Sequence, residues 1–133
     1  MTVQWTEEYA TGDPEIDAQH KQLFQYIADL EKHIADQDVS DKYLKRFLDF
    51  LGLYTRTHFC YEEICMRRRN CPVAAKNKEQ HEKLVEAYQR FRARFDAEGA
   101  NRELLEQLHN FLLSWLKNHI LRIDTHLRNC KPA

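Results

Sequence analysis

The clearest structural pattern in the sequence lies in residues 41–69, DKYLKRFLDFLGLYTRTHFCYEEICMRRR. Its inner positions recur every three or four residues, which is the period of an α-helix with one face turned to a core. They are Leu44, Phe47, Leu48, Leu51, Thr55, His58, Glu62 and Cys65. The first half of this stripe is apolar, whereas the second half carries an imidazole and a carboxylate. The segment therefore predicts a long amphipathic helix with ionisable groups buried near its C-terminal end.

Three further segments have the same period. They span about residues 15–36, 73–97 and 102–129, and short polar or Gly- and Pro-containing links separate them. Their inner stripes are His20, Leu23, Phe24, Ile27, Leu30 and Ile34; Asn77, His81, Leu84, Tyr88, Phe91 and Phe95; and Leu105, Leu108, Leu112, Trp115, His119 and Ile123. Four long helices with short links predict an all-α fold, an up-down-up-down four-helix bundle. We expect one domain over residues 1–133, with an extended N-terminal arm over residues 1–14.

Composition and charge argue against several classes of protein. Lys and Arg total 20 against 21 Asp and Glu, so no basic excess favours binding to nucleic acid or to an anionic membrane. No apolar run approaches the roughly 20 residues that cross a bilayer, and the N-terminus lacks the basic and apolar regions of a signal peptide. We therefore expect a cytoplasmic protein. Its four cysteines should then be reduced, with a redox-linked pair of Cys71 and Cys130 as the alternative.

Ionisable side chains lie on the inner side of every predicted helix. They are His20, His58, Glu62, His81, His119 and Asp124. At roughly 1.5 Å rise per residue, all of them fall about 7 to 16 Å from the same end of the bundle. Burying such groups without partners costs several kcal/mol, and imidazole with carboxylate suits iron, manganese or zinc. The pattern therefore predicts a metal site in one layer of the core.

Sequence spacing predicts how these side chains project. His58 and Glu62 are four residues apart and share a helix face. His119 and Asp124 are five residues apart, about 140° around an ideal helix, so we expect a local π-type turn that brings both inward. The ferritin-like alternative needs paired Glu-x-x-His motifs, and only Glu106 with His109 fits, away from this layer.

The order of these motifs resembles the hemerythrin family, in particular its bacterial hemerythrin-like domains. The family has a histidine on the first helix, H-x-x-x-E on the second, H-x-x-x-H on the third and H-x-x-x-x-D on the fourth. The corresponding residues here are His20, then His58-Phe59-Cys60-Tyr61-Glu62, then Asn77-Lys78-Glu79-Gln80-His81, then His119-Ile120-Leu121-Arg122-Ile123-Asp124. The likeness covers nearly the whole chain.

The resemblance implies a non-haem di-iron centre that binds O₂ or a small anion such as azide. The implied ligands are His20 and His58 for one iron, His81 and His119 for the other, and Glu62 and Asp124 as bridges beside an oxo or hydroxo group. It also implies a binding protein without catalytic residues, not an enzyme.

Asn77 departs from the family pattern, which has a histidine at this position. An amide oxygen is a weaker ligand for iron than an imidazole, so the iron held by His81 and His119 should lose one protein bond. We therefore expect both irons to have an exchangeable position, filled by water or a small anion; the alternative is that Asn77 coordinates weakly or orders a water and little else changes. An open position should ease oxidation, which favours an oxygen or redox sensor. Such a sensor would suit the input domain of a longer signalling protein, such as a diguanylate cyclase or a chemoreceptor, or a homodimer. The alternatives are a reversible O₂ carrier or store and a di-iron enzyme that consumes peroxide or nitric oxide.

Overall fold

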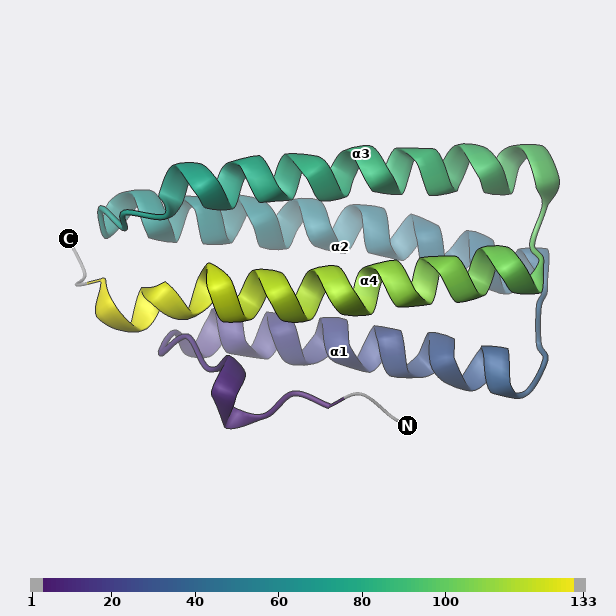
Figure 1. The fold of residues 1–133 in the computed structure, drawn as a ribbon, viewed down its shortest axis with the longest axis horizontal. Helices are drawn as coiled ribbons and strands as arrows, with labels where there is room; N and C mark the ends of the chain where they lie inside the picture. Colours follow the sequence, from purple (N-terminus) through teal and green to yellow (C-terminus); the bar gives the residue numbers. More distant parts are fainter. Residues whose placement is uncertain (1–3, 131–133) are drawn as a thin grey trace.

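A computed structural model describes residues 4–130 of the chain. It contains four long helices, which are α1 (Pro14–Ala35), α2 (Asp41–Arg68), α3 (Ala74–Glu98) and α4 (Arg102–Arg122). The helices lie side by side and alternate in direction, with α1 against α4 and α2 against α3 (Figure 1). No strand occurs in this part of the chain, and none of its helices is long and apolar enough to cross a membrane. The predicted all-α, up-down-up-down bundle is confirmed.

Side-chain caps mark the starts of three of the four helices. Asp13, Ser40 and Asn101 accept hydrogen bonds from backbone N–H groups in the first turns of α1, α2 and α4. Each cap of this kind stabilises a helix by about 1 kcal/mol. α3 begins after Val73 without a side-chain cap. It is followed by Gly99, whose φ of 75° suits a residue without Cβ.

Two apolar clusters enclose the layer that carries the ionisable residues. The larger cluster is built from all four helices and consists of Tyr9, Leu23, Phe24, Ile27, Leu30, Leu44, Phe47, Leu48, Leu51, Phe59, Leu84, Leu104, Leu105, Leu108, Leu112, Leu116 and Ile120. The smaller cluster is Ile16, Met66, Cys71, Ile123 and Leu127. Along α2 the buried side chains follow the order Phe59, Glu62, Met66. Apolar contacts therefore keep water from the layer on both sides.

The prediction of one continuous fourth helix is wrong beyond Arg122. α4 ends there, Ile123 takes φ −116° and ψ −62°, and the chain continues as a 3₁₀ helix, η2 (Asp124–Asn129). The expected π-type turn is also wrong. A continuous helix would direct Asp124 about 140° away from His119. Ending α4 between them lets both side chains point into the core.

The N-terminal arm contains one turn of 3₁₀ helix, η1 (Glu7–Tyr9), and runs along the edge of the bundle (Figure 1). Tyr9 is buried, and its ring centroid lies 5.0 Å from that of Phe24. Arg128 of η2 donates a hydrogen bond to the carbonyl oxygen of Glu8 at 2.9 Å. The arm is therefore packed on the bundle and bound to η2. Residues 1–3 of the predicted arm lie outside the described residues.

A disulfide joins Cys71, in the link between α2 and α3, to Cys130, directly after η2, with their Cα atoms 5.5 Å apart. The expectation that all four cysteines are reduced is wrong for this pair. The physical reason is proximity, because the end of η2 returns to the α2–α3 link at the same end of the bundle. Cys60 and Cys65 on α2 are free thiols.

Candidate metal centre

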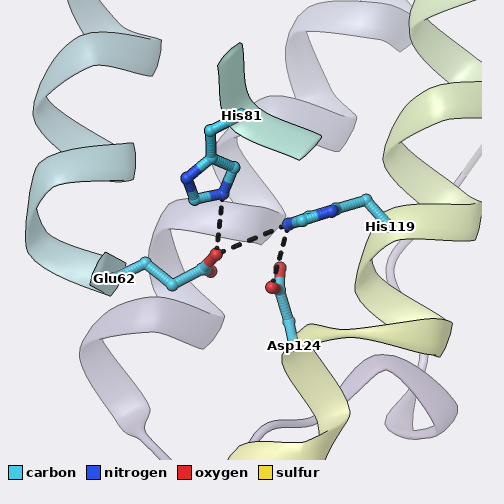
Figure 2. Close-up of side chains that lie close together, drawn as sticks. All are labelled: Glu62, His81, His119 and Asp124. Carbon is cyan, nitrogen blue, oxygen red and sulfur yellow. Dashed lines mark hydrogen bonds and ion pairs between the residues drawn. The ribbon is translucent and has the colours of Figure 1, made fainter. Parts of the chain in front are cut away.

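The six ionisable residues predicted as ligands meet in one layer of the bundle. They are His20 of α1, His58 and Glu62 of α2, His81 of α3, His119 of α4 and Asp124 of η2. None is more than 5% exposed. Figure 2 shows Glu62, His81, His119 and Asp124 pointing toward one another. The structure thus brings together all six.

Glu62 divides its two carboxylate oxygens between two pairs of imidazoles. Its Oε2 lies 3.2 Å from Nε2 of His20 and 3.5 Å from Nε2 of His58. Its Oε1 lies 3.0 Å from Nε2 of His81 and 3.6 Å from Nε2 of His119. One carboxylate therefore touches all four histidines, with one oxygen for each pair.

The two carboxylate oxygens of Asp124 also face different histidines. Its Oδ2 lies 3.1 Å from Nε2 of His20, and its Oδ1 lies 3.1 Å from Nε2 of His119. Each oxygen faces one member of each histidine pair. Both carboxylates therefore have the geometry of groups that bridge two neighbouring cations.

Burial and charge drive the pKa values of these histidines apart. Burial lowers the pKa of His20, but the carboxylates of Asp124 and Glu62 outweigh it and raise the pKa to about 10. Burial is likewise outweighed at His119, where the same two carboxylates raise the pKa to about 9. At His58 burial dominates and lowers the pKa to about 3. Burial tends to raise the pKa of Glu62, but the imidazoles around it hold that pKa well below its usual range. Without metal, two imidazolium rings thus supply the positive charge beside the carboxylates.

Several buried polar atoms in this layer have no hydrogen-bond partner. They are both ring nitrogens of His20, Oε2 of Glu62, Nδ2 of Asn77, Nδ1 of His119 and both carboxylate oxygens of Asp124. The short ion-pair distances at His20 and Asp124 therefore lack the alignment of hydrogen bonds. Unsatisfied buried groups each cost about 1–3 kcal/mol, and metal coordination removes that cost.

The donor set fits two cations. The potential ligand atoms of Glu62, His81, His119 and Asp124 lie within 4.8 Å of one another, and so do those of His20, His58 and Glu62. The two groups overlap at Glu62, and neither contains a thiolate. Nitrogen and oxygen donors in such numbers suit iron, manganese or zinc.

Two outer side chains orient the ligand rings, and neither was identified from the sequence. The Nδ1–H of His58 donates to Oε1 of Gln19 at 2.5 Å, and the Nδ1–H of His81 donates to Oε2 of Glu63 at 2.9 Å. Each bond favours a ring proton on Nδ1 and so leaves Nε2 as the atom that would coordinate a cation at the centre. Without metal, Nε2 of His81 instead donates to Oε1 of Glu62 at 3.0 Å. Gln19 and Glu63 adjoin His20 and Glu62 in the chain, and that adjacency is the one signal that the sequence offers.

Asn77 occupies the place on α3 one turn before His81, and it is fully buried. Its Oδ1 lies 2.9 Å from Nε2 of His119, and its Nδ2 has no partner. The amide therefore lies beside His119 of the second histidine pair.

Aromatic rings stack on two of the four imidazoles. Phe59 stacks on His81 with ring centroids 3.8 Å apart, and Trp115 stacks on His119 at 4.5 Å. Both rings belong to the faces of the helices that carry the ligands. They cover one face of each imidazole and help to hold both rings in place.

Comparisons with known proteins agree with this geometry. Residues 11–128 match the family described as hemerythrin HHE cation binding domain. A bacteriohemerythrin of Methylococcus capsulatus is 31% identical over 130 residues, which is 97% of this chain and 96% of that protein. A hemerythrin-like protein of Naegleria gruberi is 30% identical over 90% of this chain and 86% of its own length. A crystal structure of wild-type hemerythrin superposes with a TM-score of 0.82 at 28% identity and covers 98% of both chains. This chain belongs to the hemerythrin HHE family and is a metal-binding domain of that family.

Proposed function

We propose that the chain is a non-haem di-iron domain that binds O₂ and reports oxygen or redox state. The proposed ligands are His20 and His58 for one iron, His81 and His119 for the other, and Glu62 and Asp124 as bridges. A reduced di-iron pair supplies the two electrons that reversible O₂ binding requires. The observation that carries the proposal is the division of Glu62, which directs one oxygen to each histidine pair.

The protein's own part in this function is to hold the ligands and to exclude water. Gln19 and Glu63 keep the Nδ1 protons of His58 and His81, so both Nε2 atoms are free to coordinate. Phe59 covers the centre from α2. The relatives that carry the name bacteriohemerythrin support O₂ as the ligand.

Asn77 is the reason to favour sensing over storage. An amide oxygen beside His119 is a weaker donor for iron than the imidazole that the family has there, so an iron held by His81 and His119 would keep a position open to water or a small anion. A store must protect its bound O₂ from water and protons. An additional open position works against such protection, so the centre should oxidise readily and report O₂ through its oxidation state.

The di-iron assignment is tested by metal content. After anaerobic loading, the purified chain should hold two irons, and Glu62→Ala should hold fewer because it removes the donor shared by both groups. Glu82→Ala, an exposed site on α3, is the matched control and should keep two. One iron in the unaltered chain, or two in folded Glu62→Ala, would contradict the shared carboxylate.

The sensing assignment is tested by Asn77→His, which restores the family's ligand. Autoxidation after exposure to O₂ should become about tenfold slower, equivalent to roughly 1.4 kcal/mol in the barrier. Asn110→His, at an exposed position of α4, should leave the rate unchanged. An unchanged rate in Asn77→His removes the argument from Asn77.

Storage and enzymatic turnover give different outcomes. If the oxygenated protein lasts for hours and releases O₂ intact under vacuum, the chain is a carrier. Sustained consumption of peroxide or nitric oxide with a reductant, lost in His58→Ala, would identify an enzyme.

A further inference from the structure

Two surface cavities border the proposed metal layer, and they differ in charge. The first lies between α2 and α3 and reaches His81; the charged residues that line it are Glu63, Glu82 and Glu86 with Arg56, Arg67 and Lys78. The second, which we call the α3/α4 cavity, has a volume of about 570 Å³ and reaches His119. Acidic and basic groups balance in the first cavity. In the second, no carboxylate lines the wall.

The α3/α4 cavity carries two cations without a counter-charge. Lys76 and Arg122 line it, and neither forms an ion pair within residues 4–130. Gln80, Asn118 and Ser114 add hydrogen-bond donors to the same wall. Lys76 also lies in the first turn of α3, which has no acidic residue and no side-chain cap, so the positive end of the helix dipole adds to the field. The cavity therefore favours negative charge.

The inner end of the cavity is a buried polar group without a partner. His119 lines the cavity, its side chain is only 3% exposed, and its Nδ1 has no hydrogen bond. On the other side of the ring, Nε2 lies 2.9 Å from Oδ1 of Asn77. A ligand that reaches His119 therefore arrives next to the position where the family's histidine is missing. Because so little of His119 is exposed and Trp115 stacks on its ring, the approach to the layer is narrow and suits only a small ligand.

We propose that the α3/α4 cavity binds small inorganic anions of the size of azide and leads them to the metal position beside Asn77. This inference rests on the proposed di-iron function. Lys76 and Arg122 attract the anion at the surface, and the amide and hydroxyl donors replace its hydration shell. Uncharged ligands such as O₂ gain nothing from these charges, so the cavity separates the two classes of ligand.

The rate of azide binding to the di-ferric protein tests this inference. At low ionic strength, Lys76→Gln combined with Arg122→Gln should slow azide association about tenfold, and added salt should remove most of the difference. Arg56→Gln combined with Lys78→Gln removes the same charge from the α2/α3 cavity and is the matched control, expected to leave the rate unchanged. Nitric oxide, which is uncharged, should bind the ferrous forms of all three proteins at the same rate.

A second measurement does not depend on the metal's chemistry. Crystals soaked in bromide should show an anomalous peak in the α3/α4 cavity between Lys76 and Arg122, and the double variant should lose it. An equal loss of azide rate in both double variants, an unchanged rate in the cavity variant, or a cavity without bromide would each overturn the inference while the di-iron proposal stands. Absence of iron from the purified and reloaded chain would instead refute the proposed function itself.

Discussion

Removal of the metal should make the stability of this protein fall steeply above neutral pH. Without metal, His20 and His119 have pKa values raised to about 10 and about 9, whereas unfolded histidine titrates near 6.5. Between these values the folded chain holds two protons that the unfolded chain has lost. The stabilisation from both groups is therefore complete below pH 6.5 and is lost as the pH rises toward 9 and 10.

The size of the effect follows from the number of protons. Each proton bound only by the folded state changes the free energy of unfolding by about 1.4 kcal/mol per pH unit, so two give on the order of 2 to 3 kcal/mol per unit above pH 7. The total stability of such a domain is about 5–15 kcal/mol. On the acid side His58, with its pKa lowered to about 3, has the opposite sign, and stability is lost as the pH falls below 6.5. The metal-free protein should therefore be most stable near pH 6.5.

Urea unfolding in the presence of a chelator at pH 6.5, 7.5 and 8.5 measures this dependence. The iron-loaded protein is the comparison, since its ligands are held by metal and should show a much weaker dependence over the same range. Titration of the metal-free protein with a divalent cation at pH 7 should also release about two protons per chain. A stability that is flat or rises from pH 6.5 to 8.5, or metal uptake without proton release, would refute the assignment of protons to His20 and His119.

Three further substitutions have definite expected outcomes. Cys130→Ser removes a disulfide between residues that are 59 positions apart in the sequence. It should lower the free energy of unfolding by about 4 kcal/mol, because the unfolded chain gains conformational entropy. A melting temperature equal to that of the oxidised protein would show that the disulfide contributes nothing. Glu63→Gln should weaken metal affinity about tenfold in chelator competition, because it weakens the hydrogen bond that orients His81. Glu82→Gln is the control, and its metal affinity should match that of the unaltered chain. Gly52→Ala should lower the free energy of unfolding in urea by about 1–3 kcal/mol, because the new Cβ would lie 2.7 Å from Oη of Tyr88. The hydroxyl of Tyr88 is held there by its hydrogen bond to the carbonyl oxygen of Leu48. A gain in stability would mean that Tyr88 moves aside.

The four-helix bundle and its polar layer were predictable because both follow from helical periodicity. The stripe on residues 41–69 places Glu62 three turns after Leu51 on one face, and the structure keeps that face inward. The same reasoning located histidines on the other three helices at a common depth. Burial of ionisable groups is costly enough that their coincidence in one layer indicates a metal site before any atom is placed.

The features that the sequence did not predict depend on contacts between distant segments. No glycine or proline marks the end of α4 at Arg122. Its break instead coincides with burial of Leu127 and with the hydrogen bond from Arg128 to the arm, both tertiary interactions. The contacts of Gln19 and Glu63 depend on the rotation of each helix about its own axis, which periodicity fixes only to within a residue. The Cys71–Cys130 pair depends on the path of η2, so the sequence offered it only as the alternative to four reduced cysteines.

The break after Arg122 also places one proposed ligand on a different helical segment from the others. Five of the six side chains stand on long helices, whereas Asp124 stands on η2, the last described helical segment of the chain. Loss of that carboxylate needs only the local unfolding of η2, not the separation of two long helices. The disulfide to Cys71 and the Arg128 contact with the arm fasten this end in two places. Metal release in this protein should therefore begin at η2, and the lifetime of the loaded centre under a chelator should measure how firmly that end is fastened.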